Sequence, residues 1–152
     1  MMRVVPIGII HTPFKCKKNM PIQPFKSRAS GTVEVFKKYE EGLSDVDGFS
    51  HVLLVYRFHK SRGYKLKIRP FLDRRERGIF SCRYPRRPNQ IGISVVRLAC
   101  RHKNILFVKN VDMLDGTPLL DIKPYNPDFE PKKGVKIGWY KNVMNAVPHK
   151  EV

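Results

Sequence analysis

The sequence has 152 residues, of which 41% are hydrophobic and 11% aromatic, and this suits one ordinary domain with a single core. No stretch approaches the roughly 20 apolar residues of a membrane-spanning helix, and no signal-peptide cleavage pattern is present, so we expect a cytoplasmic protein without a membrane partner. The cysteines Cys16, Cys82 and Cys100 lie far apart without CxxC spacing. This pattern disfavours a disulfide framework or a zinc site, and predicts buried or half-buried thiols and no bound metal.

The apolar runs along the chain predict a series of short strands. After the first run, Lys15–Ser30 contains prolines without periodicity, which indicates an irregular loop able to close over a ligand. Lys37–Leu43 fits a helical turn, His102-Lys103-Asn104 fits a hairpin turn, and Gly134–Ala146 is the late helix candidate. The strands are expected, in chain order, at Val4–Ile10, Thr32–Phe36, Val52–Phe58, Gly78–Cys82, Ile91–Cys100, Ile105–Val111 and Leu119–Ile122.

Six or seven strands at short spacing, with no long amphipathic helix before residue 134, indicate an all-β fold. We expect a small closed or nearly closed β-barrel with a few short helices, formed by residues 1–152 as a single domain. Val52–Phe58 is expected to be a buried central strand. The sequence shows no internal repeat and no GxGxxG pattern, which disfavours a doubly wound nucleotide-binding fold.

The formal net charge of +17 is concentrated in two parts of the chain. Residues 1–30 contain six basic and no acidic side chains, and residues 51–103 contain fifteen basic against two acidic ones. Residues 31–50 are net acidic, and residues 104–152 are nearly balanced. So local an excess attracts polyanions, which makes nucleic acid the expected partner, with solubility alone as the alternative.

Within the basic part, cationic side chains alternate with aromatic ones. Such a pattern offers cations to phosphates and rings to unpaired bases. Rings in strands more often pack into the core, so both interpretations stay open. The residues concerned are Arg57, Lys60, Arg62, Lys65, Lys67 and Arg69 among the cations, and Tyr56, Phe58, Tyr64 and Phe71 among the rings.

A first candidate site block spans Arg83–Ser94, where two prolines precede a predicted strand. Pro85 and Pro88 fix their own φ angles and push the residues before them into extended conformations. The loop is therefore stiff, and it holds Arg83, Arg86 and Arg87 in defined directions. The arginine fork suits carboxylates and phosphates, although these residues would also serve to cover a barrel rim.

A second block spans Asp112–Tyr125 and places polar residues at a turn between apolar ones. Asp115-Gly116 is a strong turn signal, because Gly116 can take a positive φ and allow a ligand close to the main chain. Asp121 and Lys123 share one face of a strand, so they either pair with each other or flank a pocket. A plain hairpin with a surface ion pair is the alternative.

Together these blocks resemble the tRNA methyltransferase O family, also called TsaA-like or YaeB-like. The resemblance rests on the arginine, RPN, IG and serine of the first block and on DGTP and DIKPY in the second. It extends to Ile7–Phe14, to Gly48–His51 and to Lys136–Trp139. Cys82 stands where the family usually has threonine, and Gln90 where proline is common. We expect a short form of the family, without the C-terminal extension of longer bacterial members.

The resemblance implies an enzyme that uses S-adenosylmethionine as its cofactor, acts on tRNA and forms a homodimer with the cofactor near the interface. The family methylates the exocyclic amine of threonylcarbamoyladenosine, next to the anticodon. RNA contacts are expected at Arg86, Arg87, Asn89 and Lys123. Carried over by position, the cofactor contacts fall at Pro21, Ile22, Gln23, His59, Lys60, Arg83, Leu114, Asp115, Gly116 and Thr117.

Methyl transfer from a sulfonium is an in-line displacement, so the protein must align the acceptor nitrogen and remove its proton. Asp115 is the candidate catalytic residue for the proton, with Asp112 as its rival and Lys123 or Tyr125 less favoured. Two alternatives to an enzyme remain. One is a non-catalytic module that binds S-adenosylmethionine or RNA, and the other is a basic barrel that binds only RNA.

Overall fold

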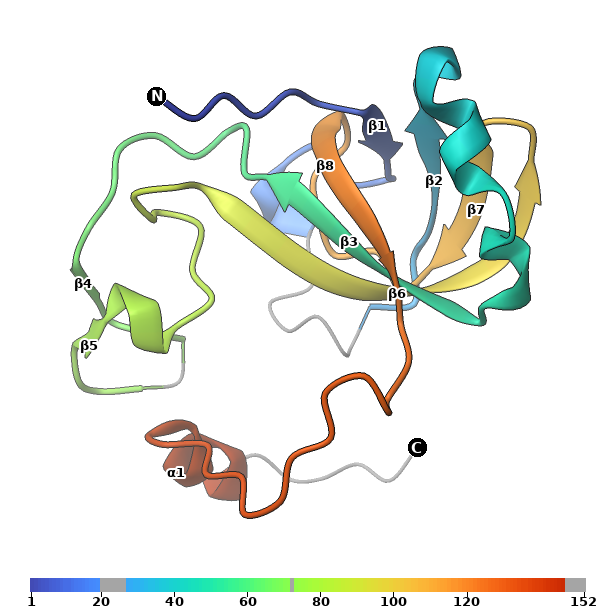
Figure 1. Cartoon of the computed structure of the whole chain (residues 1–152). Coiled ribbons are helices and arrows are strands. Elements are labelled where there is room, and N and C mark those ends of the chain that lie inside the picture. Colours follow the sequence, from blue (N-terminus) through green and yellow to red (C-terminus); the bar gives the residue numbers. More distant parts are fainter. Residues whose placement is uncertain (20–26, 72, 147–152) are drawn as a thin grey trace.

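A computed structural model of the protein describes residues 1–19, 27–71 and 73–146. At its centre lies a closed antiparallel barrel with the strand order β1-β2-β7-β6-β3-β8, which β8 closes by pairing with β1 (Figure 1). The prediction of an all-β barrel is confirmed. The barrel strands are β1 (Gly8–His11), β2 (Ser30–Val35), β3 (His51–Arg57), β6 (Ile91–His102), β7 (Ile105–Lys109) and β8 (Thr117–Pro124).

The core fills the barrel because side chains alternate along its strands. In β6, exposed and buried residues alternate strictly from Ile91 to Leu98, as the period of two requires. Gly8 allows β1 to approach β2 closely, since a Cβ there would lie 2.1 Å from the Glu34 carbonyl oxygen. The fully buried core side chains include Ile10, Val33, Val52, Leu54, Val96, Leu106, Val111 and Leu119.

Several short elements surround the barrel. The helical turn predicted at Lys37–Leu43 is the 3-10 helix η3, with the same bounds, and it precedes η4 (Val46–Gly48). η1 (Lys17–Asn19) follows β1. The hairpin predicted at His102-Lys103-Asn104 is confirmed, and Lys103 takes a φ of 53° there. No helix of the described residues is long and apolar enough to cross a membrane.

Some sequence predictions were wrong in detail. Gly78–Cys82 is not a strand, because β5 ends at Gly78 and η5 (Ile79–Ser81) follows. Of Gly134–Ala146, only α1 (Tyr140–Ala146) is helical, since Gly134 and Gly138 have positive φ angles that a right-handed helix excludes.

Bounds differ at both ends of the barrel sheet. β1 begins at Gly8 rather than Val4, after Pro6, which has no N–H for a strand ladder. β8 is longer than the predicted Leu119–Ile122. The thiols of Cys16 and Cys100 are exposed rather than buried or half-buried, and only Cys82 is partly covered.

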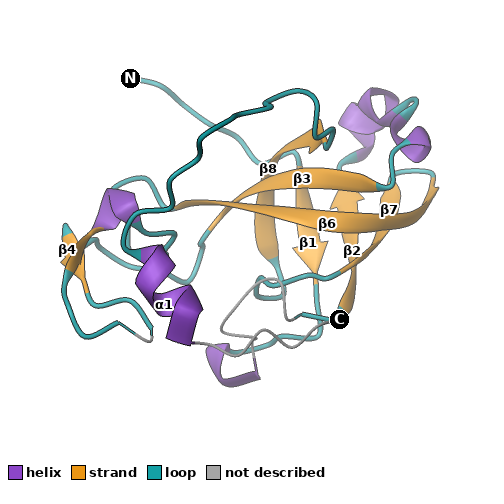
Figure 2. Ribbon diagram, turned by 90° about the horizontal axis from the view of Figure 1, so that it is seen from below, coloured by secondary structure: helices purple, strands orange, loops and turns teal. Residues whose placement is uncertain are grey.

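Residues 58–90, here called the arm, leave the barrel after β3 and return at β6. The arm contains a small hairpin of β4 (Lys67–Ile68) and β5 (Arg77–Gly78), followed by η5. Figures 1 and 2 show the arm beside the barrel, with α1 next to it. The Trp139 indole N–H donates to the Ser81 carbonyl oxygen at 2.9 Å, which ties the C-terminal segment to the arm.

Candidate functional site

The turn before β8 is held against the end of β1 by hydrogen bonds. The Gly116 N–H donates to the Ile10 carbonyl oxygen at 2.9 Å, and the Asp115 N–H to that of Phe14 at 2.8 Å. The buried Thr12 hydroxyl donates to the Met113 carbonyl oxygen at 2.8 Å. The predicted Asp115-Gly116 turn, and Met113 just before it, are therefore fixed to the end of β1 and to the residues that follow β1.

Asp115 is strongly engaged within this turn. Its carboxylate accepts the Thr12 main-chain N–H at 2.9 Å and lies 2.5 Å from the Lys15 Nζ. His11 Nδ1 lies 3.9 Å away. The hydrogen bond from Lys15 is the main cause that lowers the pKa of Asp115 below its usual range. Both carboxylate oxygens thus have cationic or N–H partners, which suits a positioning role better than proton uptake.

Gly116 and His59 lie close together. Gly116 has a φ of 79°, and a Cβ added there would lie 4.0 Å from His59 Nε2. Burial is the main cause that lowers the pKa of His59, and the neighbouring Lys60 and Arg57 lower it further. The imidazole is therefore held in its neutral form at neutral pH. The structure thus brings together two residues at which cofactor contacts are expected.

The other predicted members of the turn are occupied in maintaining it. The Thr117 hydroxyl is buried and donates to the Leu114 carbonyl oxygen at 2.6 Å. The Thr117 N–H donates to the same oxygen at 3.3 Å. Both donors of Thr117 are therefore engaged with Leu114 and hold the turn closed.

A chain of three polar side chains lies near this turn, with Tyr56 and Ser94 buried and Asp112 partly buried. Ser94 Oγ donates to Asp112 Oδ1 at 2.7 Å, and Ser94 Oγ and the Tyr56 hydroxyl lie 2.9 Å apart. Since the Ser94 hydrogen is directed at Asp112, the Tyr56 hydroxyl must be the donor to Ser94. Gly92 makes room for this chain, because a Cβ there would lie 2.6 Å from the Tyr56 ring and 2.7 Å from that of Phe58.

Burial sets the protonation of this chain. It raises the pKa of Asp112 above its ordinary value, despite the hydrogen bond from Ser94. Burial also raises the pKa of Tyr56, as does the charge of Asp112, while Arg83 acts in the opposite direction. Tyr56 therefore stays a phenol, and Asp112 is the more basic of the two carboxylates near the turn.

The arginines of the first block have different environments. Arg87 Nη1 donates to the carbonyl oxygens of Cys82 at 2.6 Å and Tyr84 at 3.2 Å, so it braces the loop from within. Arg83 is exposed and has no ion-pair partner among the described residues. Arg86 and Asn89 are exposed as well.

Lys123 lies apart from these arginines. It pairs with Asp121 at 2.9 Å, and this contact is the main cause that raises the pKa of Lys123. In the barrel register Lys123 stands opposite Leu53, while the arm begins beyond Arg57, at the other end of β3. Pro21, Ile22 and Gln23, also expected to contact the cofactor, lie outside the described residues.

The Tyr56–Ser94–Asp112 chain was not recognised from the sequence. Its signal was present, because Ser94 interrupts the apolar inward face of β6, where Val96 and Leu98 follow at spacings of two. Lys15 was also missed. Its partner Asp115 lies 100 residues further along the chain, so no local pattern connects them.

The chain is similar to several known proteins. A "Probable S-adenosyl-L-methionine-binding protein" of Pyrococcus abyssi is 53% identical over 140 residues, which are 91% of this chain and 76% of that protein. The tRNA (adenine(37)-N6)-methyltransferase of Mus musculus is 36% identical over 87% of this chain and 32% of its own length.

A crystal structure of TrmO superposes with a TM-score of 0.76 at 38% identity. The match covers 91% of this chain and 64% of that one, so the chain spans less than two thirds of the solved protein. The family model described as tRNA-methyltransferase O N-terminal domain matches residues 9–131. The chain therefore belongs to the tRNA-methyltransferase O family.

Proposed function

We propose that this chain is an S-adenosylmethionine-dependent tRNA methyltransferase that acts on the exocyclic amine of threonylcarbamoyladenosine next to the anticodon. The observation that carries the proposal is that the arm contributes His59 next to Gly116 and Arg83 near the Tyr56–Ser94–Asp112 chain. Family membership supports the cofactor and the tRNA class. The proposal goes beyond family membership in assigning the threonylcarbamoyl-modified base as the substrate.

The residues around the turn fit the cofactor chemically. S-adenosylmethionine carries a carboxylate, an ammonium group, two ribose hydroxyls and a flat base. The unpaired Arg83 fork suits its carboxylate, and the bare main chain of Gly116 beside His59 allows a flat group to approach closely. Lys60 is exposed next to His59 and adds positive charge. When bound, the cofactor supplies an electrophilic methyl group on a sulfonium.

The chain's own residues must then orient the acceptor and take its proton. We assign the proton to Asp112 rather than Asp115. Asp112 is partly buried and its pKa is raised, whereas Asp115 is occupied by Lys15 and Thr12. Transfer of the acceptor N–H proton to the Asp112 carboxylate would leave the hydrogen bonds of Ser94 and Tyr56 in place. Asp115 instead positions the Gly116 turn.

We also propose a homodimer, for which β6 offers a surface. Ile91, Ile93 and Val95 point outward along β6 at a spacing of two, and each is more than 40% exposed. A contiguous apolar stripe on a sheet is typical of a protein interface. Light scattering should give twice the mass of the chain, and Ile93→Glu should shift it to the monomer mass. A monomeric wild-type chain would refute the dimer.

The test of function uses two tRNA substrates that differ only in the threonylcarbamoyl group. Incubation with methyl-labelled S-adenosylmethionine and mass spectrometry of the anticodon loop should show one methyl group on the modified tRNA and none on the unmodified one. Equal labelling of both would refute the substrate assignment. Calorimetric binding of S-adenosylmethionine without any transfer would favour the non-catalytic module instead.

A further inference from the structure

We propose that a pocket in the arm, separate from the cofactor turn, holds one unpaired nucleotide of the bound RNA. Its phosphate would lie on the cations of the pocket and its base on the ring of Tyr84. The choice of RNA as ligand rests on the proposed function, whereas the pocket itself rests on the geometry of the arm. The residues that line it are Lys65, Lys67, Ile68, Arg69, Glu76, Tyr84 and Arg86.

The walls of the pocket are joined by main-chain hydrogen bonds. The Lys65 N–H donates to the Arg86 carbonyl oxygen at 3.2 Å, and the Ile79 N–H to that of Leu66 at 2.8 Å. The Gln90 side chain donates to the Gly63 carbonyl oxygen at 3.0 Å. The segment before β4 is therefore fixed to the proline-rich loop, which gives the pocket two supported sides.

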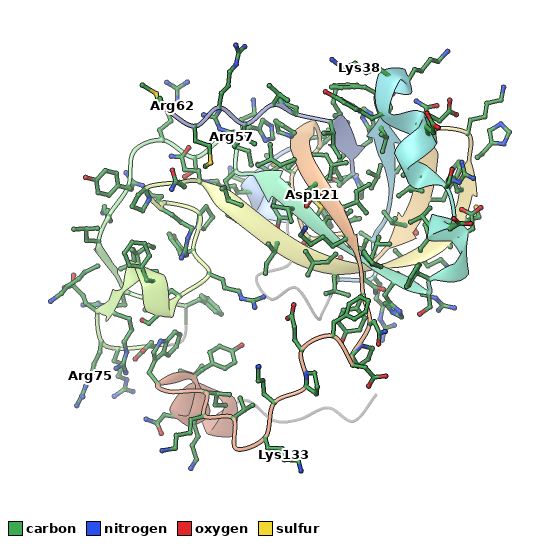
Figure 3. All side chains as sticks on the ribbon, viewed as in Figure 1. Lys38, Arg57, Arg62, Arg75, Asp121 and Lys133 are labelled. Carbon is green, nitrogen blue, oxygen red and sulfur yellow. The ribbon has the colours of Figure 1, made fainter. Side chains whose placement is uncertain are left out.

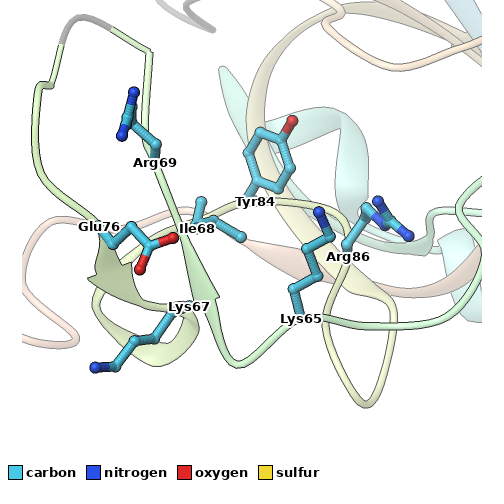
Figure 4. Close-up of a pocket in the computed structure, with 7 residues that line it drawn as sticks. All are labelled: Lys65, Lys67, Ile68, Arg69, Glu76, Tyr84 and Arg86. Atoms are coloured by element: carbon cyan, nitrogen blue, oxygen red, sulfur yellow. The ribbon is translucent and has the colours of Figure 1, made fainter.

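The cavity has a volume of about 370 Å³, near the lower end of the range of small-ligand sites. This volume suits a single nucleotide. Ile68 is a buried residue of the lining, and in Figure 4 the side chains of Lys65 and Arg86 lie next to each other. A paired RNA helix would present only its backbone there, because its bases are enclosed in the duplex.

Four cations and one carboxylate line this pocket. None of Lys65, Lys67, Arg69 and Arg86 has an ion-pair partner in the described ranges. Asp73, the other carboxylate of the arm, binds Arg77 at 2.7 Å. The cations are thus left for an external anion, and a phosphate is the anion that RNA supplies.

Tyr84 adds the feature that distinguishes a nucleotide from a simple anion. Its side chain is 45% exposed although it lies among the cations. Pro85 follows it and restricts its backbone to an extended conformation, which fixes the direction in which the side chain leaves the loop while the ring stays exposed. Base–aromatic stacking tolerates any base, and Glu76 offers an acceptor to a base amino group.

The pocket lies in the most basic part of the molecule. Figure 3 shows Arg62 and Arg75 on the arm, while Lys38 of η3 lies at the opposite side of the barrel. Lys37 and Lys38 are exposed there and provide a matched control. The double variants Lys65→Glu/Arg69→Glu and Lys37→Glu/Lys38→Glu change the net charge equally, but only the first alters the pocket.

Binding is measured by fluorescence anisotropy with a labelled anticodon stem–loop RNA and with a blunt RNA duplex, at several salt concentrations. Lys65→Glu/Arg69→Glu should weaken stem–loop binding at least about tenfold more than the control pair, and reduce the salt slope by about 0.7 for each lost phosphate contact. Equal losses in the two double variants would overturn the pocket.

A second set of variants tests whether a base stacks on Tyr84. Tyr84→Ala should weaken stem–loop binding by about fivefold to a hundredfold, while Tyr84→Phe should bind like the wild type. Phe80→Ala removes an exposed arm ring outside the pocket and should have little effect. If Tyr84→Ala weakens binding of the duplex as much as binding of the stem–loop, stacking of an unpaired base on Tyr84 is excluded. Displacement of RNA by polyglutamate as effective as by unlabelled RNA would indicate an acidic protein partner and overturn the assignment.

Cofactor binding and thermal melting of each variant confirm that it is folded. If the wild-type chain transfers no methyl group but Lys65→Glu/Arg69→Glu selectively loses RNA, the proposed function fails and the pocket stands. If the wild type methylates tRNA but the two double variants bind RNA equally, the pocket fails and the proposed function stands.

Discussion

Ser94 Oγ donates a 2.7 Å hydrogen bond to Asp112 Oδ1 and thereby joins the inward face of β6 to the loop that precedes β8. Asp112→Asn keeps an acceptor for this hydrogen bond but removes the base. We expect methyl transfer to fall by about 10²–10⁴-fold, the usual contribution of a general base, with little change in cofactor affinity. Full activity of this variant in single-turnover assays would remove Asp112 from the mechanism.

The effect of Asp112→Asn on the stability of the fold should depend on pH. The pKa of Asp112 is raised in the folded state, so its contribution to stability is fully present below the ordinary value of about 3.9 and is lost as pH rises through the folded value. Asp112→Asn should therefore raise the melting temperature at pH 7 but not at pH 3.5. Calorimetric melting at both pH values tests this, and an equal shift at both would contradict it.

Asp115→Asn tests the positioning role of the Gly116 turn. The pKa of Asp115 is lowered, so this residue contributes stability above the ordinary carboxyl value, and that stability is lost as pH falls through the lower folded value. The Lys15 contact is largely exposed, so its loss should cost at most about 1 kcal/mol. We expect weaker cofactor binding and a methyl-transfer rate within about tenfold of the wild type.

Lys15→Ala is the matched control, because it removes the same contact and keeps the carboxylate. Similar cofactor affinities in the two variants would support positioning through the turn. If Asp115→Asn loses methyl-transfer rate and Lys15→Ala does not, Asp115 rather than Asp112 is the proton acceptor.

Gly116→Ala should weaken cofactor binding and destabilise the fold by about 1–2 kcal/mol, since an L residue is strained at a φ of 79°. Gly134→Ala provides a control at a φ of 65° with open space around the added Cβ. Both variants should show similar unfolding in urea, but only Gly116→Ala should lose affinity for S-adenosylmethionine by calorimetry. Equal affinities in the two variants would separate Gly116 from the cofactor site.

Variants of Arg83 and Arg87 should differ in whether they affect cofactor binding or the stability of the fold. Arg83→Ala is expected to leave the melting temperature nearly unchanged and to reduce cofactor affinity about tenfold or more, because its fork has no partner in the described part of the chain. Arg87→Ala breaks two hydrogen bonds to carbonyl oxygens and should lower the melting temperature. The reverse pattern in melting and calorimetry would refute both assignments.

The barrel could be predicted because its signals are local. The apolar run Val52–Phe58 and the β-branched residues of Ile91–Cys100 indicate strands, and turns separate them. Their alternation of buried and less buried residues is visible only in the structure. Gly78–Cys82 misled because a short apolar run suits a strand or a 3-10 turn equally well. The aromatic residues of the basic part have both of the environments considered from the sequence. Tyr56 is 3% exposed and lies in the core, while Tyr64 is 59% exposed on the arm.

The site could be predicted only in part. The Asp115-Gly116 turn and the arginine-rich loop have local signatures, and their positions agree with the structure. The choice between Asp112 and Asp115 depends on burial and on Lys15, both of which arise only when distant segments meet. For the same reason, the expected RNA contact at Arg87 did not anticipate that its guanidinium braces its own loop.

The closure of the barrel by β8 also determines when the site can exist during synthesis. Thr12 meets Asp115 across 103 residues of chain, and β1 finds its second neighbour only when β8 has emerged. Contacts this distant in sequence form slowly, because a long loop must be ordered first. A nascent chain that ends before β8 has both basic regions but lacks the closed barrel that holds the Asp115-Gly116 turn against β1. Under the proposed function, affinity for RNA would therefore precede the capacity for methyl transfer.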